Sequence, residues 1–300
     1  MKNQSRSDLS LAQRWVLAIR PKTLTAAVAP VIVGWGVAHT TGYFHWGAAL
    51  VAMFVSIMIQ IGTNLVNDVV DFSKGADTEA RTGPLRVTQT GLLTPRQVWS
   101  GVIVTFGLAV LAGLYLTWIA GWPVLILGAL CLLSGIGYTA GPFPLAYHGL
   151  GDLFVLLFFG FAAVVGTVFV VGAEIPPLAW FAAMAAGVLT VNILVVNNIR
   201  DIETDRAAGR KNLPVVFGRK AAESEFALML VIAYAIPPIL TCKQVSSPWV
   251  LLSLLTLPQG IRIWGRLRSG QSGQVLNPLL GQTAQLLLRF CVLFTIGLLI

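Results

Sequence analysis

Two groups of acidic and amide side chains could bind metal, and each follows a long apolar run. The first is NLVNDVVD, in which Asn64, Asp68 and Asp71 are separated by four and three residues. Residues three or four apart lie on one face of an α-helix. A helix through this stretch would therefore present one amide and two carboxylates along a single stripe.

A similar group occurs further along the chain, with its first aspartate 133 residues after Asp68. In NNIRDIETD, Asn197, Asp201 and Asp205 follow one another at spacings of four and four. If each helix continues about two turns beyond its apolar run, both stripes lie at the same membrane face. The match indicates a weak parallel repeat of four-helix units.

Carboxylates grouped at a low-dielectric boundary are costly unless a cation neutralises them. Mg2+ prefers oxygen ligands, takes one or two carboxylates per ion, and completes its shell with water and phosphate oxygens. We therefore expect Mg2+ ions that bridge to a diphosphate, with the ligands Asn64, Asp68, Asp71, Asp201 and Asp205. The alternative is that these acids only pair with nearby Arg and Lys on solvated loops, which explains one motif better than two matched ones.

Membrane-spanning helices must position these groups. The sequence is 56% hydrophobic and 11% charged, whereas soluble domains carry about 25% charged residues. Backbone groups in lipid must bond within the protein, so long apolar runs predict an all-α, polytopic fold, whereas a barrel would show short alternating strands. A span needs about 20 apolar residues, and we predict nine of them, at 23–41, 46–66, 98–119, 122–139, 152–172, 178–198, 224–242, 248–264 and 283–300.

Positive charges predict the orientation of these spans. Of the 20 Lys and Arg residues, 18 fall in the leader 1–22, the loops 67–97 and 199–223, and the end of the eighth span. With nine spans, all of these segments lie on one side. The positive-inside rule places that side in the cytoplasm and the C-terminus outside, in the cell inner (plasma) membrane. Topology thus explains the net charge of +8, and no nucleic acid partner is expected.

Five segments resemble a known family. They are RPKTL (20–24), NDVVDFSKGADTEARTGPLRVTQTGLLTP (67–95), YTAGPFPLAYHGLGD (138–152), NNIRDIETDRAAGRKNLPVVFGRK (197–220) and LNPLLGQTAQLLL (276–288). The two aspartate motifs resemble those of the UbiA superfamily of intramembrane prenyltransferases. The KGADTE, GPLRVTQTGL and GLGD segments are similar to those of the 1,4-dihydroxy-2-naphthoate polyprenyltransferases of menaquinone synthesis.

The resemblance implies one membrane domain, 1–300, with about nine helices around a central cavity capped by the two cytoplasmic loops. It also implies a reaction. Mg2+ and cations bind a polyprenyl diphosphate, the allylic carbocation is attacked by 1,4-dihydroxy-2-naphthoate, and carbon dioxide leaves to give a demethylmenaquinol. The lipid bilayer would supply access for the apolar tail.

Further residues are expected to contact the substrates. Tyr138 could stabilise the carbocation with its ring, or simply anchor the helix at the interface. Arg20 and Lys22 could bind phosphate or the naphthoate carboxylate, or act only as topology signals. The remaining candidates for substrate binding are Asn64, Asn67, Lys74, Arg81, Arg86, Gln89, Asn197, Asn198, Arg210 and Lys211.

The chain departs from the family pattern at two places. Where a Lys-x-Thr arrangement is usual after Gly209, it has Arg210, Lys211 and Asn212. The phosphate contact could therefore come from either of the first two. Gly75 occupies the position of a third aspartate, so that Asp77 is a substitute candidate.

Two alternative functions stay open. The first is a UbiA-type prenyltransferase with another acceptor, such as 4-hydroxybenzoate, haem or a chlorophyllide. The second is a cation-coupled secondary transporter, although transporters place such acids near the bilayer midplane. The length of the prenyl tail does not follow from the sequence.

Overall fold

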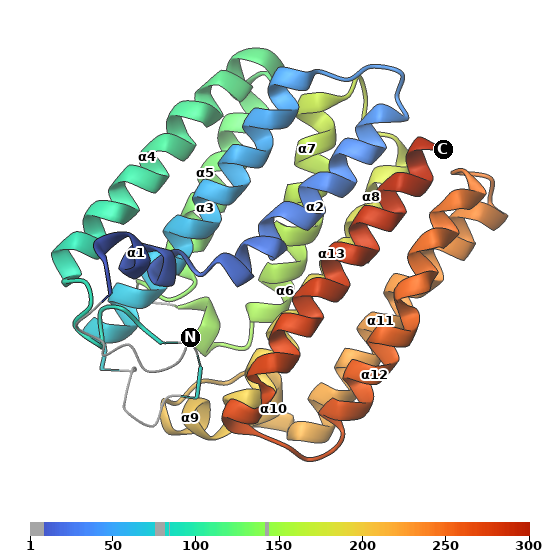
Figure 1. The fold of residues 1–300 in the computed structure, drawn as a ribbon. Helices are drawn as coiled ribbons and strands as arrows, with labels where there is room; N and C mark the ends of the chain where they lie inside the picture. The colour runs from blue at the N-terminus through green and yellow to red at the C-terminus, as the bar shows by residue number, and fades with distance from the viewer. Residues whose placement is uncertain (1–8, 76–81, 84, 142–143) are drawn as a thin grey trace.

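The computed structural model describes residues 9–75, 82–83, 85–141 and 144–300. Over these residues the chain is helical and contains no β-strand. The expected all-α fold is therefore confirmed, and Figure 1 shows its long helices side by side. Three of the sequence-predicted residues lie outside the described ranges: Asp77, Glu79 and Arg81.

The described residues form nine helical passes, one for each predicted apolar run. In chain order these are α2 (Pro21–His39), α3 (Trp46–Ser73), α4 (Pro95–Ala120), α5 (Trp122–Gly137), the series α6 (Gly151–Val155), η3 (Leu156–Ala162) and α7 (Ala163–Val171), then α8 (Pro177–Arg200), α11 (Arg219–Cys242), the pair η4 (Pro248–Thr256) and α12 (Leu257–Leu267), and α13 (Asn277–Leu299).

Seven of these passes are long and apolar enough to cross a membrane. The other two are α5, which has only 16 residues, and η4–α12, which changes from a 3₁₀-helix to an α-helix at Leu257. The count of nine spans is thus approximate. The chain is a multi-pass membrane protein.

Short helices cover one end of the bundle, which we call the site end because α3 and α8 both finish there. They are α1 (Leu11–Ile19), η2 (Leu145–Tyr147), α9 (Ile202–Ala207), α10 (Leu213–Phe217) and η5 (Gly273–Leu276). Figure 1 shows α9 and α10 at the bottom of the bundle. The two aspartate motifs therefore meet at one end, as their matched positions predicted.

The two motifs differ in local structure. α3 continues to Ser73, so Asp68 and Asp71 lie within it. α8 ends at Arg200, and Asp201 leaves the helix with φ −99° and ψ 11° before α9 begins. Our expectation of a continuous helix through Asp205 is thus wrong. The Arg200 guanidinium stabilises the break, because it folds back onto the Asp201 carboxylate.

α8 lies in the middle of the bundle because its small residues allow close approach. In its most apolar stretch 72% of the residues are buried, against 17% for α4, which identifies α4 as a peripheral helix. A Cβ built on Gly187 of α8 would come within 2.9 Å of the Gly160 Cα in η3. Packing through small residues is typical of helices in membranes.

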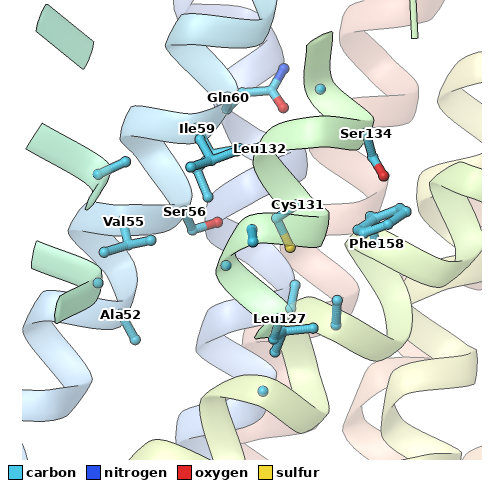
Figure 2. Close-up of a pocket in the computed structure, with 18 of the residues that line it drawn as sticks. Ala52, Val55, Ser56, Ile59, Gln60, Leu127, Cys131, Leu132, Ser134 and Phe158 are labelled. Atoms are coloured by element: carbon cyan, nitrogen blue, oxygen red, sulfur yellow. The ribbon is translucent and has the colours of Figure 1, made fainter. Parts of the chain in front are cut away.

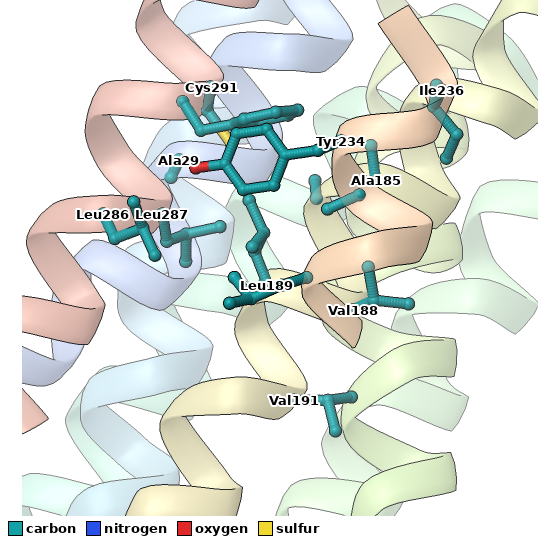
Figure 3. Packing of buried hydrophobic residues seen from close by; sticks show 14 of the residues in the cluster. Ala29, Ala185, Val188, Leu189, Val191, Tyr234, Ile236, Leu286, Leu287 and Cys291 are labelled. Atoms are coloured by element: carbon teal, nitrogen blue, oxygen red, sulfur yellow. The ribbon is translucent and has the colours of Figure 1, made fainter. Parts of the chain in front are cut away.

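The largest buried apolar cluster joins α2, α8, α11 and α13, and Figure 3 shows part of it. Tyr234 of α11 meets Phe290 of α13 edge to face, with ring centroids 5.4 Å apart. The Tyr234 hydroxyl forms a 2.7 Å hydrogen bond with Thr256. We call these four helices, together with the η4–α12 pass that contributes to the same cluster, the dense half of the bundle. The remaining passes α3, α4, α5 and η3–α7 form the hollow half, which contains the cavity described below.

Candidate active site at the ends of α3 and α8

Asp68 is fully buried in the last turns of α3 and connects three segments of the chain. Its carboxylate accepts hydrogen bonds from the backbone N–H groups of Val87 (3.2 Å) and Thr88 (3.0 Å). It also pairs with Arg20 at 3.3 Å. Arg20 joins α1 to α2 and has a φ of +57°, which is uncommon for a residue with a side chain. Asp68 thus fixes both the α1–α2 junction and the loop that follows α3.

Asp71 is 2% exposed and offers one unused oxygen. Its Oδ2 accepts a 2.7 Å hydrogen bond from Arg86 Nη2, and Arg210 Nη2 lies 3.7 Å from the same oxygen. Its Oδ1 is buried and accepts no hydrogen bond from any described residue. A buried acceptor without a donor is costly. Asp71 Oδ1 is therefore available as a ligand atom for a cation.

Asp201 is bound at both oxygens by Arg200, through Nε at 2.8 Å and Nη2 at 2.5 Å. Thr82, from the loop after α3, donates its hydroxyl hydrogen bond to the same carboxylate. Arg200 is buried and also donates to Asn197 (2.8 Å) and to Asn277 of α13 (3.1 Å). The ion pairing that we considered as an alternative role is thus present at Asp201. Sequence reasoning missed Arg200 as a site residue, because it counted this arginine only as a topological charge.

Arg210 connects the two aspartate motifs. Its Nη1 lies 3.3 Å from Asp205 Oδ1, and its Nη2 is the atom 3.7 Å from Asp71 Oδ2. Asn212 donates a 2.6 Å hydrogen bond to the other oxygen of Asp205. Burial raises the pKa of Asp205 to about 6, against the opposing effects of Arg210 and Asn212. Two carboxylates from distant parts of the sequence therefore share one guanidinium group.

The ring of Tyr147, in η2, contacts one cation near each motif, Lys74 and Arg210. Lys74 Nζ is 5.6 Å from the ring centroid and the Arg210 guanidinium carbon is 5.0 Å from it. Lys74 also donates a 2.7 Å hydrogen bond to the Thr139 carbonyl. Such cation–π contacts orient charged side chains. Sequence reasoning missed Tyr147, whose only signal was its place within YTAGPFPLAYHGLGD.

Two predicted amides, the metal ligand Asn64 and the substrate-binding candidate Asn67, are already hydrogen-bonded within the protein. The Asn64 oxygen accepts from Gln60 at 3.3 Å, and its nitrogen donates to Thr23 at 2.8 Å. The Asn67 oxygen accepts from the Thr139 hydroxyl at 2.7 Å. Both amides therefore hold helices and loops together, and a metal at Asn64 or a substrate at Asn67 would have to displace or share these contacts.

The other predicted binding residues differ in exposure. Lys22 is exposed at the start of α2. Lys211 is exposed too, and its backbone N–H donates to the Tyr147 carbonyl at 3.2 Å. Of the pair that the sequence left open, Arg210 is the one that contacts the acids. Two further candidates are buried or half-buried at the site end: Asn198 and Gln89.

The described residues contain no group of three or more Asp, Glu, His or Cys side chains placed to hold a metal by themselves. A closed protein cage is therefore not formed among them. Mg2+ commonly uses one or two carboxylates and takes its remaining ligands from water and phosphate. The buried, donor-free Asp71 Oδ1 fits a site of that kind, which substrate completes.

A cavity of about 410 Å³ lies in the hollow half and is lined mainly by apolar side chains. Figure 2 shows Ile59 of α3 and Cys131 of α5 on its wall, with Phe158 of η3 nearby. At the site end its lining includes Asn67 and Tyr138. The cavity thus reaches from the membrane interior to the α3 motif, and Tyr138 is positioned on its wall.

Comparisons with known proteins agree with this arrangement. The UbiA prenyltransferase family matches residues 27–275. A 1,4-dihydroxy-2-naphthoate octaprenyltransferase from Mycobacterium tuberculosis is 35% identical, over 91% of this chain and 92% of its own length. A protein of the same name from Escherichia coli K12 is 34% identical, over 97% and 96%.

A solved structure shows the same fold. A UbiA homologue from Archaeoglobus fulgidus bound to DMAPP and Mg2+ has a TM-score of 0.67, with 94% of this chain and 99% of that chain covered. Its sequence identity to this chain is 19%, so the likeness establishes the fold alone.

Proposed function

Because the chain belongs to the UbiA prenyltransferase family, we propose that it transfers a long-chain prenyl group from a polyprenyl diphosphate to 1,4-dihydroxy-2-naphthoate. Carbon dioxide is lost, and the product is a demethylmenaquinol of menaquinone biosynthesis. One observation supports this most strongly: an apolar cavity ends at Asn67 and Tyr138, beside carboxylates and cations. The names of the two bacterial relatives support the choice of acceptor.

The site end would bind the diphosphate. Arg86, Arg210 and Lys74 place three cations around Asp71 and Tyr147, and preorganised cations stabilise charge that develops on a leaving group. Arg forks suit bidentate phosphate contacts, and Lys acts as a point charge. Arg20 would serve mainly to hold Asp68 in position, since it already pairs with that carboxylate.

The aspartates Asp68, Asp71, Asp201 and Asp205 would hold Mg2+, with Asp71 as the residue best prepared for it. When bound, Mg2+ supplies positive charge that neutralises the diphosphate and makes it a better leaving group. The chain's own contribution would be to present Asp68 and Asp71 on the last turns of α3, and Asp201 and Asp205 just beyond the end of α8.

The cavity would hold the prenyl tail and exclude water from the reacting carbon. The allylic carbon–oxygen bond breaks and its electrons leave with diphosphate. The ring carbon that bears the carboxylate then forms the new carbon–carbon bond. Carbon dioxide departs from this carbon and leaves its bonding electrons to the ring, so no external proton is needed. Tyr138, on the cavity wall, would face the allylic cation with its ring.

We also propose that the site end faces the cytoplasm, with the C-terminus on the opposite side, in accordance with the clustering of basic residues there. Single cysteines introduced in place of the exposed Lys211 and Lys243 would test this orientation, in a chain whose three native cysteines are replaced by alanine because Cys242 is itself exposed. In right-side-out cells, an impermeant thiol reagent should label only the second of them.

The test of the reaction is a donor and acceptor panel with purified protein. Long-chain donors are combined with 1,4-dihydroxy-2-naphthoate, 4-hydroxybenzoate, haem or a chlorophyllide, with Mg2+ or with EDTA. We expect a prenylated naphthalenediol whose mass shows loss of carbon dioxide, formed only with Mg2+. Asp71→Asn should abolish it, whereas Glu203→Gln, on an exposed side chain of α9, should not. Absence of transfer to the naphthoate from every donor would refute the proposal.

A further inference from the structure

Three arginines on α12 and α13 have no part in the proposed reaction. Arg262 and Arg266 lie on α12, Arg289 lies on α13, and all three are exposed. Gln259 precedes Arg262 by three residues, and Arg266 follows it by four, so these side chains share one face of α12. Gln282 and Arg289 are seven residues apart and share one face of α13.

The two polar faces contact one another. Gln259 donates to the Gln282 carbonyl at 3.0 Å. Arg289 donates to the Gln259 side-chain oxygen at 2.8 Å, and Arg266 donates to that of Gln282 at 3.2 Å. A polar seam therefore runs between α12 and α13 on the outside of the bundle.

The charges of this seam are not neutralised within the described part of the chain. The ion pairs of the described residues include none of its three arginines. The last carboxylate side chain of the sequence is that of Glu225, so neither α12 nor α13 contains an acid. The hydrogen bonds that the arginines donate go to neutral oxygens only.

The position of Arg289 gives its charge a high free-energy cost. It lies 12 residues into α13, within the candidate span Gly273–Leu299. A charged side chain inside a span is costly, and such residues commonly mark a functional site. An anionic ligand would remove much of that cost.

A cavity of about 470 Å³ lies at the seam. The polar part of its wall is formed by Gln259, Arg262 and Arg289. The apolar part includes Leu255, Leu288 and Leu293. This combination matches a ligand with a phosphate at one end and a hydrocarbon chain at the other.

We propose that the seam between α12 and α13 binds an anionic phospholipid, with its phosphate held by Arg262 and Arg289 and an acyl chain along the leucines. Basic pockets between membrane helices bind anionic headgroups, and guanidinium groups match phosphate geometry. A second copy of this chain is the less favourable occupant. Its matching surface would carry the same positive charges, since symmetric interfaces pair like patches.

Native mass spectrometry of the delipidated protein tests the proposal, with phosphatidylglycerol and phosphatidylcholine titrated separately. The variant is Arg262→Gln with Arg289→Gln. The control, Lys243→Gln with Arg268→Gln, removes the same charge elsewhere on the chain. Prenyl transfer in phosphatidylcholine vesicles shows whether each variant is folded. If the double variant does not fold, the single variant Arg262→Gln replaces it in the titrations.

We expect wild type and control to retain phosphatidylglycerol more strongly than phosphatidylcholine. The seam variant should lose affinity for phosphatidylglycerol by about thirty-fold, or about five-fold for the single change, because each basic residue near an anionic headgroup contributes about five-fold. Equal retention of both lipids by wild type would overturn the proposal. The proposal would also be overturned if inorganic phosphate displaced phosphatidylglycerol as effectively as added phosphatidylglycerol does. A seam variant that altered the oligomeric state and left lipid binding unchanged would overturn it too.

Discussion

Replacement of Arg210 tests whether one guanidinium group serves both aspartate motifs. Its two terminal nitrogens lie 3.3 Å from Asp205 and 3.7 Å from Asp71. At these distances each pair has a gross Coulomb attraction of about 5 kcal/mol at an effective dielectric constant of ~20. Desolvation offsets most of this attraction, and a net value of about 1.5–3 kcal/mol per charged contact is typical.

Arg210→Gln should therefore lower kcat/KM for the prenyl diphosphate by about 10- to 150-fold, because one such contact to phosphate is lost in the transition state. Arg210→Lys keeps the charge but cannot reach both carboxylates through separate nitrogens, so an intermediate loss is expected. Stability should change less than activity, since Asp71 retains Arg86 and Asp205 retains Asn212.

The assay is the initial rate of prenyl transfer at saturating acceptor and varied donor. Arg206→Gln is the matched control, because Arg206 on α9 pairs with Glu203 at the surface, where both side chains are more than half exposed. Exposed pairs of that kind contribute little, so its rate should stay within about two-fold of wild type. An Arg210→Gln enzyme with unchanged kcat/KM would refute the assignment of Arg210 to the diphosphate.

Three further predictions follow from the geometry. Asp68→Ala should lower the free energy of unfolding by about 2 kcal/mol or more, because two buried loop N–H groups lose their acceptor. Asp68→Asn keeps one acceptor oxygen, so thermal unfolding should show a smaller loss of stability than for Asp68→Ala. Equal losses of stability in the two variants would contradict this reasoning. Tyr147→Ala should raise the KM for the donor several-fold while Tyr147→Phe keeps the ring contacts; a Phe variant as poor as Ala would shift the role to the hydroxyl. Gly128→Phe, where a Cβ meets open space on the cavity wall, should shift preference toward shorter prenyl donors, whereas Gly107→Phe, outside the cavity lining, should leave it unchanged.

The positions of the helices along the chain followed from the apolar runs, because lipid leaves the backbone little choice other than a helix. The spacing of Asp68 and Asp71 predicted their common face, since α3 continues past its apolar run. The same argument failed at Asp201. There the side chain of the neighbouring Arg200 stabilises a break, and spacing alone cannot reveal a contact of that kind.

The contacts between the two motifs were less accessible from the sequence. Arg210 was a candidate, but nothing in its position distinguished it from Lys211 before the fold placed one inward and the other in solvent. Thr82 reaches the site through a loop and Tyr147 through the three-residue helix η2, and segments of this kind carry no periodic pattern that constrains their side chains. The predicted amide oxygens of Asn64 and Asn67 proved to be engaged with neighbouring side chains, which only three-dimensional contacts can show.

The division of the bundle into a dense half and a hollow half has a mechanical consequence. α8 is enclosed by protein, whereas α4 is mostly unburied and, with α5, forms part of the cavity wall. Lateral pressure from surrounding lipid would push these two helices inward, and a prenyl tail bound as proposed would push them outward. The thickness and tension of the membrane would thereby act on how much tail the protein admits, without any change at the aspartates.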